Sequence, residues 1–216
     1  MKTFFQPRLV DFTDEYVMRT VSELRTGYQL KRTMRYASTR DSTVHAESVA
    51  EHVFALLYLA HYFLPLEDPE GLLDVVDVHR LMLFHDFPEI AHGDVPYNLE
   101  TAVTRGREQA AAPHVFAALP PLLAGDGYLA WQDYETGRTP EARFVNALDK
   151  IEPLFELFDP VNETSLKRLR FTYETHFRKK YSSAINFPVM RRFVEVMSAD
   201  MLRRGVFWTP TEDDGA

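Results

Sequence analysis

The sequence predicts an all-α fold. Along most of the chain, apolar residues recur at spacings of three and four, as they do on one face of an amphipathic helix. Few runs alternate apolar and polar residues between Asn-Gly or Asp-Gly turns, which would indicate hairpins. With 45% hydrophobic and 26% charged residues, a chain of 216 residues can bury the core of one domain of good size. We therefore expect a single helical domain over residues 1–216.

Charge and composition exclude several classes of function. The chain has 32 acidic residues against 24 Lys and Arg, a net charge of −8, which argues against a surface for nucleic acid polymers or anionic lipid. Because it has no cysteine, it cannot form a disulfide, a thiolate metal site or a cysteine nucleophile. The apolar run at 53–60 is shorter than the about 20 residues of a membrane span. We expect a cytoplasmic protein without a signal peptide.

The helices of the first half begin at recognisable capping residues. Ser48 followed by Glu51 forms a capping box, in which each side chain accepts a hydrogen bond from the backbone amide of the other residue. Asp74 and Asp77 place negative charge where the helix dipole favours it. Pro88 lacks an amide hydrogen, so it opens a separate short helical turn. The expected helices are 14–28, 48–64, 74–87, 99–112 and a weaker one over 115–123, with a short turn and a loop over 30–44 and loops at 65–71 and 92–96.

The second half is expected to continue as helices. Thr139 and Pro140 stand in N-cap and N1 order and start a helix. Pro153 is expected to kink or end that helix. The motif-bearing core covers about residues 20–160, the C-terminal helices lie within 161–208, with amphipathic stretches at 163–180 and 188–204, and residues 209–216 form an acidic tail.

Two histidines and two aspartates lie on the apolar faces of these helices or beside them. His52 and His85 each share a stripe with apolar residues, Asp86 follows His85, and Asp149 lies on the apolar stripe of a later helix. Burying an isolated carboxylate is costly, so such groups are neutralised, paired or bound to metal. Ordinary buried histidines with ion pairs are the alternative. Other histidines are expected at the surface or on polar faces: His45, His79, His114 and His176.

These motifs resemble a known family. His52 ends the run Glu-Ser-Val-Ala-Glu-His, His85 begins His-Asp-Phe-Pro-Glu-Ile-Ala-His-Gly-Asp-Val-Pro, and Asp149 stands in Ala-Leu-Asp-Lys. The set resembles the H…HD…D signature of HD-domain metal-dependent phosphohydrolases, and in particular the YfbR-like 5'-deoxynucleotidases. The resemblance implies an HD-domain helical bundle with additional C-terminal helices. It also implies removal of the 5'-phosphate from (deoxy)nucleoside monophosphates.

A divalent metal is the expected cofactor. Imidazole and carboxylate ligands suit Mn, Co, Zn, Fe or Mg, and the absence of thiolates removes the softest preferences. Such an ion would lower the pKa of a bound water and polarise the phosphorus for in-line attack. The expected metal ligands are His52, His85, Asp86 and Asp149.

Three carboxylates are expected to act in catalysis. Asp86 can bind the metal and also hold the attacking water. Glu89 lies one helical turn after His85, so it can reach the site without being a ligand, and we assign it proton transfer or water orientation. The resemblance assigns Asp94, which follows Gly93, to the leaving oxygen or a sugar hydroxyl, with a helix cap as the alternative.

A basic segment would attract the phosphate. Residues 19–40 contain six basic residues in an otherwise acidic chain. Arg32 is the candidate for the phosphate contact, because a guanidinium can bind two phosphate oxygens and its position resembles that of the family's phosphate-orienting arginine. Arg35 is the nearest rival, and a solvated basic face is the alternative. Thr33, Asp94 and Tyr97 are the nearest candidates for contacts with the sugar.

Other hypotheses stay open at this point. An HD-type hydrolase could act on another nucleotide, such as a triphosphate or an alarmone. A di-iron oxygenase would need further histidine ligands, and a helical ligand-binding module would need no catalysis. The expected partner is a small-molecule nucleotide, with no nucleic acid polymer and no membrane, and we include a homodimer among the expected assemblies.

Overall fold

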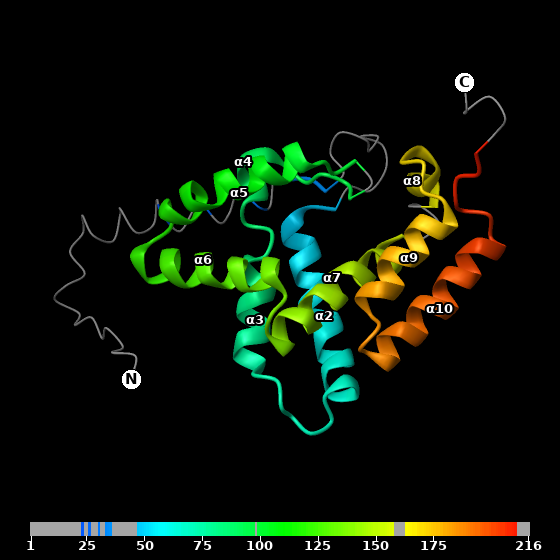
Figure 1. The fold of residues 1–216 in the computed structure, drawn as a ribbon, viewed down its shortest axis with the longest axis horizontal. Coiled ribbons are helices and arrows are strands. Elements are labelled where there is room, and N and C mark those ends of the chain that lie inside the picture. The colour runs from blue at the N-terminus through cyan, green and yellow to red at the C-terminus, as the bar shows by residue number, and fades with distance from the viewer. Residues whose placement is uncertain are drawn as a thin grey trace.

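The fold is helical, as predicted (Figure 1). The computed structural model describes Glu23, Thr26, Leu30 and residues 33–35, 47–97, 99–157 and 163–210. Within these residues, extended backbone pairs only at an isolated antiparallel bridge between Met34 and Ser48. The helices of the described chain are α2 Val49–Glu67, α3 Val75–Phe84, α4 Glu89–His92, α5 Ala102–Ala117, α6 Pro121–Thr136, α7 Pro140–Glu156, α8 Glu163–Arg168, α9 Tyr173–Ser183 and α10 Pro188–Arg203.

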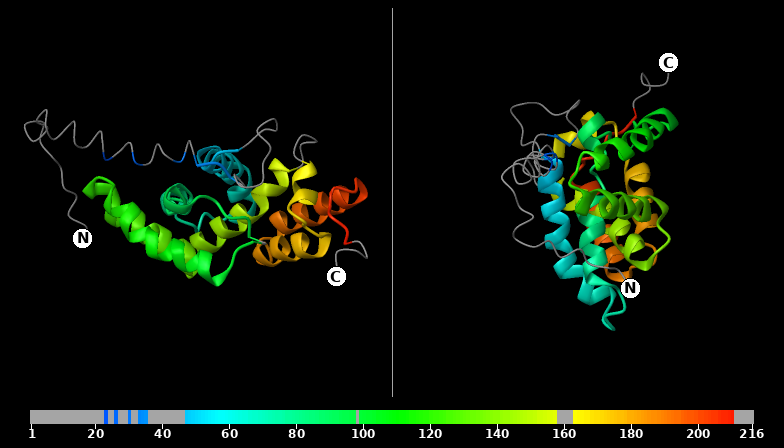
Figure 2. Two further views of the ribbon diagram at one scale, coloured as in Figure 1. Left: turned by 90° about the horizontal axis from the view of Figure 1, so that it is seen from above. Right: turned by 90° about the vertical axis from the view of Figure 1, so that its left-hand side faces the viewer.

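Helix α7 occupies the centre of the molecule. It packs against α2, α3, α6, α9 and α10. Seen from above, α5 and α6 lie toward one end and α9 and α10 toward the other, with α2 and α7 between them (Figure 2). Phe144, Leu148, Ile151 and Leu154 of α7 are fully buried in a core to which α2, α3, α5, α6 and α10 also contribute. A polar residue that α7 directs inward is therefore surrounded by several helices.

The predicted helix starts are confirmed where they rest on capping chemistry. The Ser48 backbone amide donates to the Glu51 carboxylate at 2.6 Å, and the Glu51 amide donates to the Ser48 hydroxyl at 3.2 Å. The Asp74 carboxylate caps α3, and the Thr139 hydroxyl accepts from the amide of Ala142 at the start of α7. Each cap satisfies amides that have no partner inside the helix.

Helix α2 passes the length and composition test for a membrane span. It is the one helix of the described chain that does so. Its apolar residues Val49, Leu56, Ala60 and Phe63 are nevertheless buried, and α2 packs on α3, α7 and α10. A core helix of a globular domain passes the same test, although α2 also exposes the large side chains of Phe54, Tyr58, Tyr62 and Leu66.

Helix α6 was missed by the sequence analysis. The expected helices over 99–112 and 115–123 were followed by no helix before Thr139. In the structure α5 continues to Ala117 through Pro113, and a full helix follows at Pro121–Thr136. Glycines have low helix propensity and obscured the pattern. Gly127 is nevertheless favoured by packing, because a Cβ there would lie 3.0 Å from the rings of Phe84 and Phe116.

Two further boundaries differ from those expected. Pro153 does not end α7, which continues to Glu156. The single helix expected over 163–180 is two helices, α8 and α9. Between them Arg170 has φ 57°, in the left-handed region, so the helical path is interrupted there.

Candidate active site

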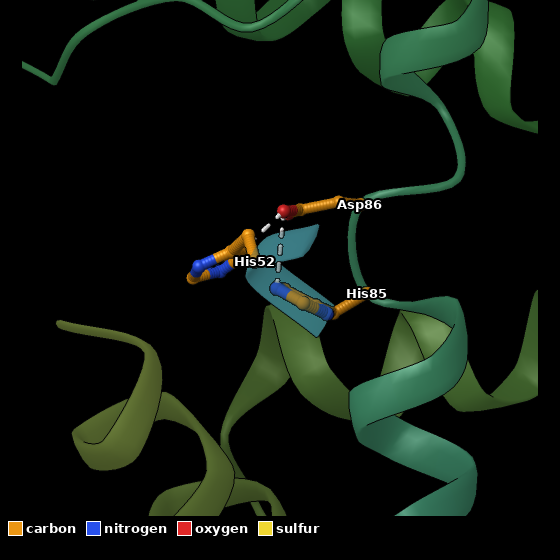
Figure 3. A group of neighbouring side chains, drawn as sticks. All are labelled: His52, His85 and Asp86. Carbon is orange, nitrogen blue, oxygen red and sulfur yellow. Dashed lines mark ion pairs between the residues drawn. The ribbon is translucent and has the colours of Figure 1, made fainter. Parts of the chain in front are cut away.

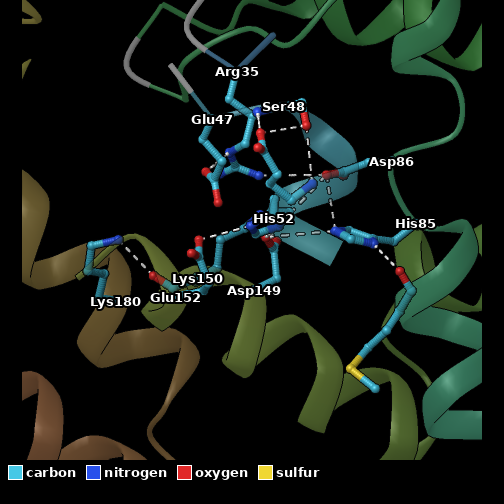
Figure 4. Close-up of polar contacts among 12 residues, drawn as sticks. Arg35, Glu47, Ser48, His52, His85, Asp86, Asp149, Lys150, Glu152 and Lys180 are labelled. Atoms are coloured by element: carbon cyan, nitrogen blue, oxygen red, sulfur yellow. Dashed lines mark hydrogen bonds and ion pairs between the residues drawn. The ribbon is translucent and has the colours of Figure 1, made fainter. Parts of the chain in front are cut away.

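Three parts of the fold bring the predicted metal ligands together. His52 lies on α2, His85 and Asp86 follow α3, and Asp149 lies on α7. Figure 3 shows the first three side chains converging, and Figure 4 shows all four. His52 is 0% exposed, His85 1% and Asp149 5%. The His52 Nε2 atom lies 3.1 Å from Asp149 Oδ1 and 3.8 Å from Asp86 Oδ2. The His85 Nε2 atom lies 3.2 Å from Asp86 Oδ2 and 3.9 Å from Asp149 Oδ1.

The spacing of His52, His85 and Asp86 fits one metal ion, and Asp149 Oδ1 lies within 3.9 Å of both imidazoles. Nitrogen and oxygen ligands lie about 2.0–2.2 Å from a transition metal, so ligands of one ion lie about 3–4 Å from each other. Nδ1 of His85 is 2.9 Å from the Met82 carbonyl oxygen, which can only accept, so Nδ1 carries the proton. Nε2 is the nitrogen that faces the cluster, 3.2 Å from Asp86 Oδ2, and in a neutral imidazole it would present its lone pair there. It is oriented as a metal ligand requires.

A carboxylate fixes the ring of His52 from the other side. Glu152 Oε2 accepts from His52 Nδ1 at 2.9 Å, and Glu152 is buried on α7 one turn after Asp149 (Figure 4). Burial and Arg35 act to lower the pKa of His52, but Glu152 and the hydrogen bond to Asp149 raise it to about 9. Without a metal, His52 therefore carries a proton that an ion would have to displace.

The two aspartates are ionised. Burial acts to raise the pKa of Asp86, but His85 and His52 outweigh it and lower the pKa to about 2. Burial likewise opposes charge on Asp149, yet Lys150 and the two histidines hold its pKa well below the usual range. Two anionic oxygens and two imidazoles form a donor set for a borderline or hard divalent cation.

Arg35 is brought to this centre by the bridge before α2. Its backbone amide donates to the Glu47 carbonyl at 2.9 Å, and the Val49 amide donates to the Thr33 carbonyl at 3.0 Å. The Arg35 guanidinium lies 3.3 Å from the Glu47 carboxylate through Nε and 3.7 Å from Asp86 through Nη1. Arg35 is buried, so its charge acts with little screening by solvent.

A cavity adjoins the ligand cluster and contains the predicted catalytic carboxylates. Glu89, the first residue of α4, and Asp94 both line it. Gly93 has φ 77°, a conformation that favours glycine, and it turns the chain from α4 into the loop that carries Asp94. Burial, together with the charges of Asp86 and Asp94, raises the pKa of Glu89 well above its usual range. This environment favours the protonated form of Glu89.

The structure places some of the predicted substrate-binding residues at the cavity and not others. Arg32 lies outside the described residues. Thr33 is described, but it is not among the residues seen to line the cavity. Tyr97 does line it, and its ring centroid is 4.7 Å from that of Phe171. Of the two arginine candidates, Arg35 is the one that the described structure brings to the cavity.

Several cavity residues were not predicted. Tyr134 comes from α6, and its hydroxyl donates to Asp149 Oδ2 at 2.5 Å. Lys180 of α9 donates to the Lys150 carbonyl at 2.7 Å, and both lysines line the cavity. Three further glutamates line the cavity: Glu100, Glu108 and Glu135. Of these residues, Lys150 alone belongs to a motif noted in the sequence, the Ala-Leu-Asp-Lys run that contains Asp149.

Comparison with known families identifies the domain. The sequence profile of the HD domain matches residues 28–187. The chain belongs to the HD domain family. The motif resemblance is therefore confirmed, and the cluster of His52, His85, Asp86 and Asp149 lies within the matched HD domain.

Curated relatives of this HD domain carry one name. 5'-Deoxynucleotidase HDDC2 of Mus musculus is 30% identical over 135 residues, which cover 62% of this chain and 65% of the relative. The protein of the same name from Homo sapiens is also 30% identical over 135 residues, with 62% and 64% covered. The match thus spans less than two thirds of the length of these relatives.

Solved structures share the fold of this HD domain. A predicted metal-dependent phosphohydrolase from Magnetospirillum magnetotacticum has a TM-score of 0.74 and 26% identity, covering 89% of this chain and 98% of that one. An HD-domain phosphohydrolase from Listeria innocua has a TM-score of 0.55 at 17% identity, covering 84% and 97%. The second likeness supports the helical fold alone.

Proposed function

We propose that this protein is a metal-dependent 5'-nucleotidase that releases phosphate from deoxyribonucleoside 5'-monophosphates. The observation that carries the proposal is the convergence of His52, His85 and Asp86 beside a buried arginine and a cavity, with Asp149 at 3.1 Å from His52. The names of the curated relatives support the substrate class, and the first solved structure supports metal-dependent phosphate chemistry. A cytoplasmic location and a homodimer remain predictions.

The proposed metal site uses both histidines through Nε2. His52, His85, Asp86 and Asp149 would hold one divalent ion of the set Mn, Co, Zn, Fe or Mg. Such an ion supplies Lewis acidity, which polarises a phosphate oxygen and makes water more acidic. Asp86 is also proposed to orient the attacking water, because its carboxylate is the least buried of the four ligands, with 17% of the side chain exposed.

Arg35 is proposed to bind the phosphate of the substrate. Its guanidinium lies 3.7 Å from Asp86, so a phosphate that reaches the metal site also comes within reach of Arg35. The guanidinium can donate two parallel hydrogen bonds, one to each of two phosphate oxygens. Arg32 stays an alternative for this contact.

Glu89 and Asp94 are proposed to act on the leaving group and the sugar. A protonated Glu89 can donate its proton to the 5'-oxygen as the bond to phosphorus breaks, so that the nucleoside leaves as a neutral alcohol. Asp94 is proposed to accept from a sugar hydroxyl or to contact the leaving oxygen. Tyr97, which lines the cavity, is proposed near the sugar, where a 2'-hydroxyl would be discriminated. The contact expected of Thr33 with the sugar stays a prediction.

The experiment is a phosphate-release screen of the purified protein. All ribo- and deoxyribonucleoside 5'-monophosphates are compared with triphosphates and with 3'-monophosphates, each with Mn, Co, Zn, Fe and Mg in turn. We expect release from 5'-monophosphates, faster for the deoxy member of each pair. Asp149→Ala should lose both the metal and the activity. Release from triphosphates alone, or full metal occupancy and unchanged turnover in Asp149→Ala, would overturn the proposal.

A further inference from the structure

The two oxygens of the Asp149 carboxylate have different partners. Oδ1 lies 3.1 Å from His52 Nε2 and 3.9 Å from His85 Nε2, within the proposed ligand cluster. Oδ2 accepts from the Tyr134 hydroxyl at 2.5 Å and from the Lys150 ammonium at 2.5 Å. The donors at Oδ2 therefore set which oxygen points toward the two imidazoles.

Tyr134 also contacts a second proposed ligand. The centroid of its ring lies 5.0 Å from that of His85, with the planes tilted by 60°. Tyr134 is 6% exposed and stands in the last turn of α6, one of the helices that pack on α7. One residue of α6 thus touches Asp149 through its hydroxyl and His85 through its ring.

The two donors at Oδ2 differ in rigidity. Lys150 has a flexible four-carbon stem, and its side chain is 30% exposed, so its ion pair is partly screened. Tyr134 has a rigid ring with two rotatable bonds, and the ring is enclosed by the core. Tyr134 is therefore the more rigidly held of the two donors to Asp149 Oδ2.

We propose that Tyr134 is a positioning residue of the metal site, which holds Asp149 by Oδ2 so that Oδ1 is presented to the ion and which supports the ring of His85. This inference rests on the ligand set of the proposed function. It adds α6 to the elements that build the site, although α6 supplies no ligand. A partner that orients a ligating carboxylate is expected to affect metal affinity more than folding.

The test removes one hydroxyl at two positions of the same helix. Tyr134→Phe keeps the ring against His85 and deletes the donor to Asp149. Tyr128→Phe is the matched control, because Tyr128 packs on Trp131 at 5.7 Å and on Phe116 at 5.9 Å. The affinity of each metal-free protein for Co²⁺ or Mn²⁺ is measured by competition with a chelator. We expect Tyr134→Phe to bind about 10- to 100-fold more weakly than the wild type and Tyr128→Phe to bind equally well.

A second measurement reports on geometry rather than on folding. The visible absorption spectrum of the Co²⁺-loaded protein depends on the ligands and their arrangement, so it should change in Tyr134→Phe and not in Tyr128→Phe. The thermal midpoints of the two metal-free variants should be similar. Affinity within twofold of the wild type with an unchanged spectrum, or an equal loss in Tyr128→Phe, would overturn the role of Tyr134.

The proposed ligand set is checked in the same titration. If Asp149→Ala loses Co²⁺ binding while Tyr134→Phe retains it, the metal site stands and only the role of Tyr134 fails. If Asp149→Ala binds Co²⁺ as the wild type does, the ligand set itself is wrong, and the inference about Tyr134 falls with it.

Discussion

His52 is held between two carboxylates of one helix, with Nε2 at 3.1 Å from Asp149 and Nδ1 at 2.9 Å from Glu152. Asp149 and Glu152 are three residues apart on α7, so they project from the same face. One imidazole therefore fixes the register of α2 against α7, and Glu152 determines which ring nitrogen carries the proton. Because a carboxylate accepts at Nδ1, Nε2 is left for the metal.

Removing Glu152 should weaken metal binding. We expect Glu152→Ala to lower the affinity for a divalent ion by about 10- to 100-fold, because His52 loses the partner that orients its ring. Glu152→Gln is the control, since its amide oxygen can still accept from Nδ1, and it should lose less. Chelator competition measures both. Equal affinity in Glu152→Ala and wild type would contradict this role.

Changing Glu89 should separate turnover from metal binding. Glu89→Gln and Glu89→Ala are expected to keep the metal and lose about 10²–10⁴-fold in kcat, which is the usual contribution of a general acid or base. Metal analysis and steady-state kinetics on one deoxyribonucleoside monophosphate measure the two effects. If Glu89→Ala lost the metal and helical content together, Glu89 would be a ligand or a structural residue instead.

Helix periodicity predicted the burial of His52, His85 and Asp149, and the motif resemblance predicted that they bind a metal together with Asp86. His52 and Asp149 each share a stripe with apolar residues, so the 3.6-residue repeat alone directs them into the core. His85 continues the apolar stripe of α3 at the end of that helix. The pattern within a helix also predicted the capping box of α2. Helix periodicity and capping residues involve neighbours in the sequence, so they can be recognised in a single sequence.

The contacts of Arg35 and Tyr134 with the site depend on tertiary packing, which no local sequence pattern predicts. Arg35 reaches the site because its backbone pairs with Glu47 across 12 residues of chain, and the sequence indicated only a loop there. Tyr134 lies in a helix whose glycines obscured its helical pattern, and its partner Asp149 is 15 residues away. Such contacts are decided by how helices cross, not by the propensity of either segment.

His176 shows the same limit, because its expected surface position is wrong. It is 1% exposed, and its ring lies 5.3 Å from that of Phe207 and 6.0 Å from that of Phe171. Phe207 follows α10, so the residue that covers His176 comes from a distant part of the chain. Because the sequence of α9 is largely polar, it did not predict that Phe207 and Phe171 bury His176.

Buried His176 should make the protein less stable in mild acid. Burial and the charge of Lys180 hold the pKa of His176 well below its usual value of 6.5. Between pH 6.5 and that lower pKa, the unfolded chain binds a proton that the folded chain does not. The free energy of unfolding therefore falls as the pH falls, by up to about 1.4 kcal/mol per pH unit from this group.

Urea denaturation at a series of pH values from 7.5 to 5.5 measures how the free energy of unfolding depends on His176. His176→Leu should show a smaller loss of stability over this range than the wild type, because the titrating group is gone. His61→Leu is the matched control, since His61 is exposed, and it should keep the slope of the wild type. Parallel pH profiles for His176→Leu and the wild type would show that His176 is not held neutral by the fold.

Arg35 should contribute equally to every 5'-monophosphate. A guanidinium on the phosphate contacts neither base nor sugar, so Arg35→Ala should lower kcat/KM for all of them by a common factor of about 10- to 100-fold, the value of a charge-assisted hydrogen bond. Arg35→Lys should restore part of this, since an ammonium cannot form the paired contact. Metal content must be measured alongside, because Arg35 also lies beside Asp86, a proposed metal ligand.

Arg32→Ala completes this experiment, because the sequence favours Arg32 and the described structure places Arg35 at the cavity. The ratio of kcat/KM for a matched ribo and deoxyribo pair distinguishes a phosphate contact from a sugar contact. Arg35→Ala with metal retained and the ratio unchanged assigns the phosphate to Arg35. If Arg32→Ala instead gave the common loss while Arg35→Ala left turnover unchanged, Arg32 would be the phosphate ligand. Arg35 would then act only through its ion pairs with Glu47 and Asp86.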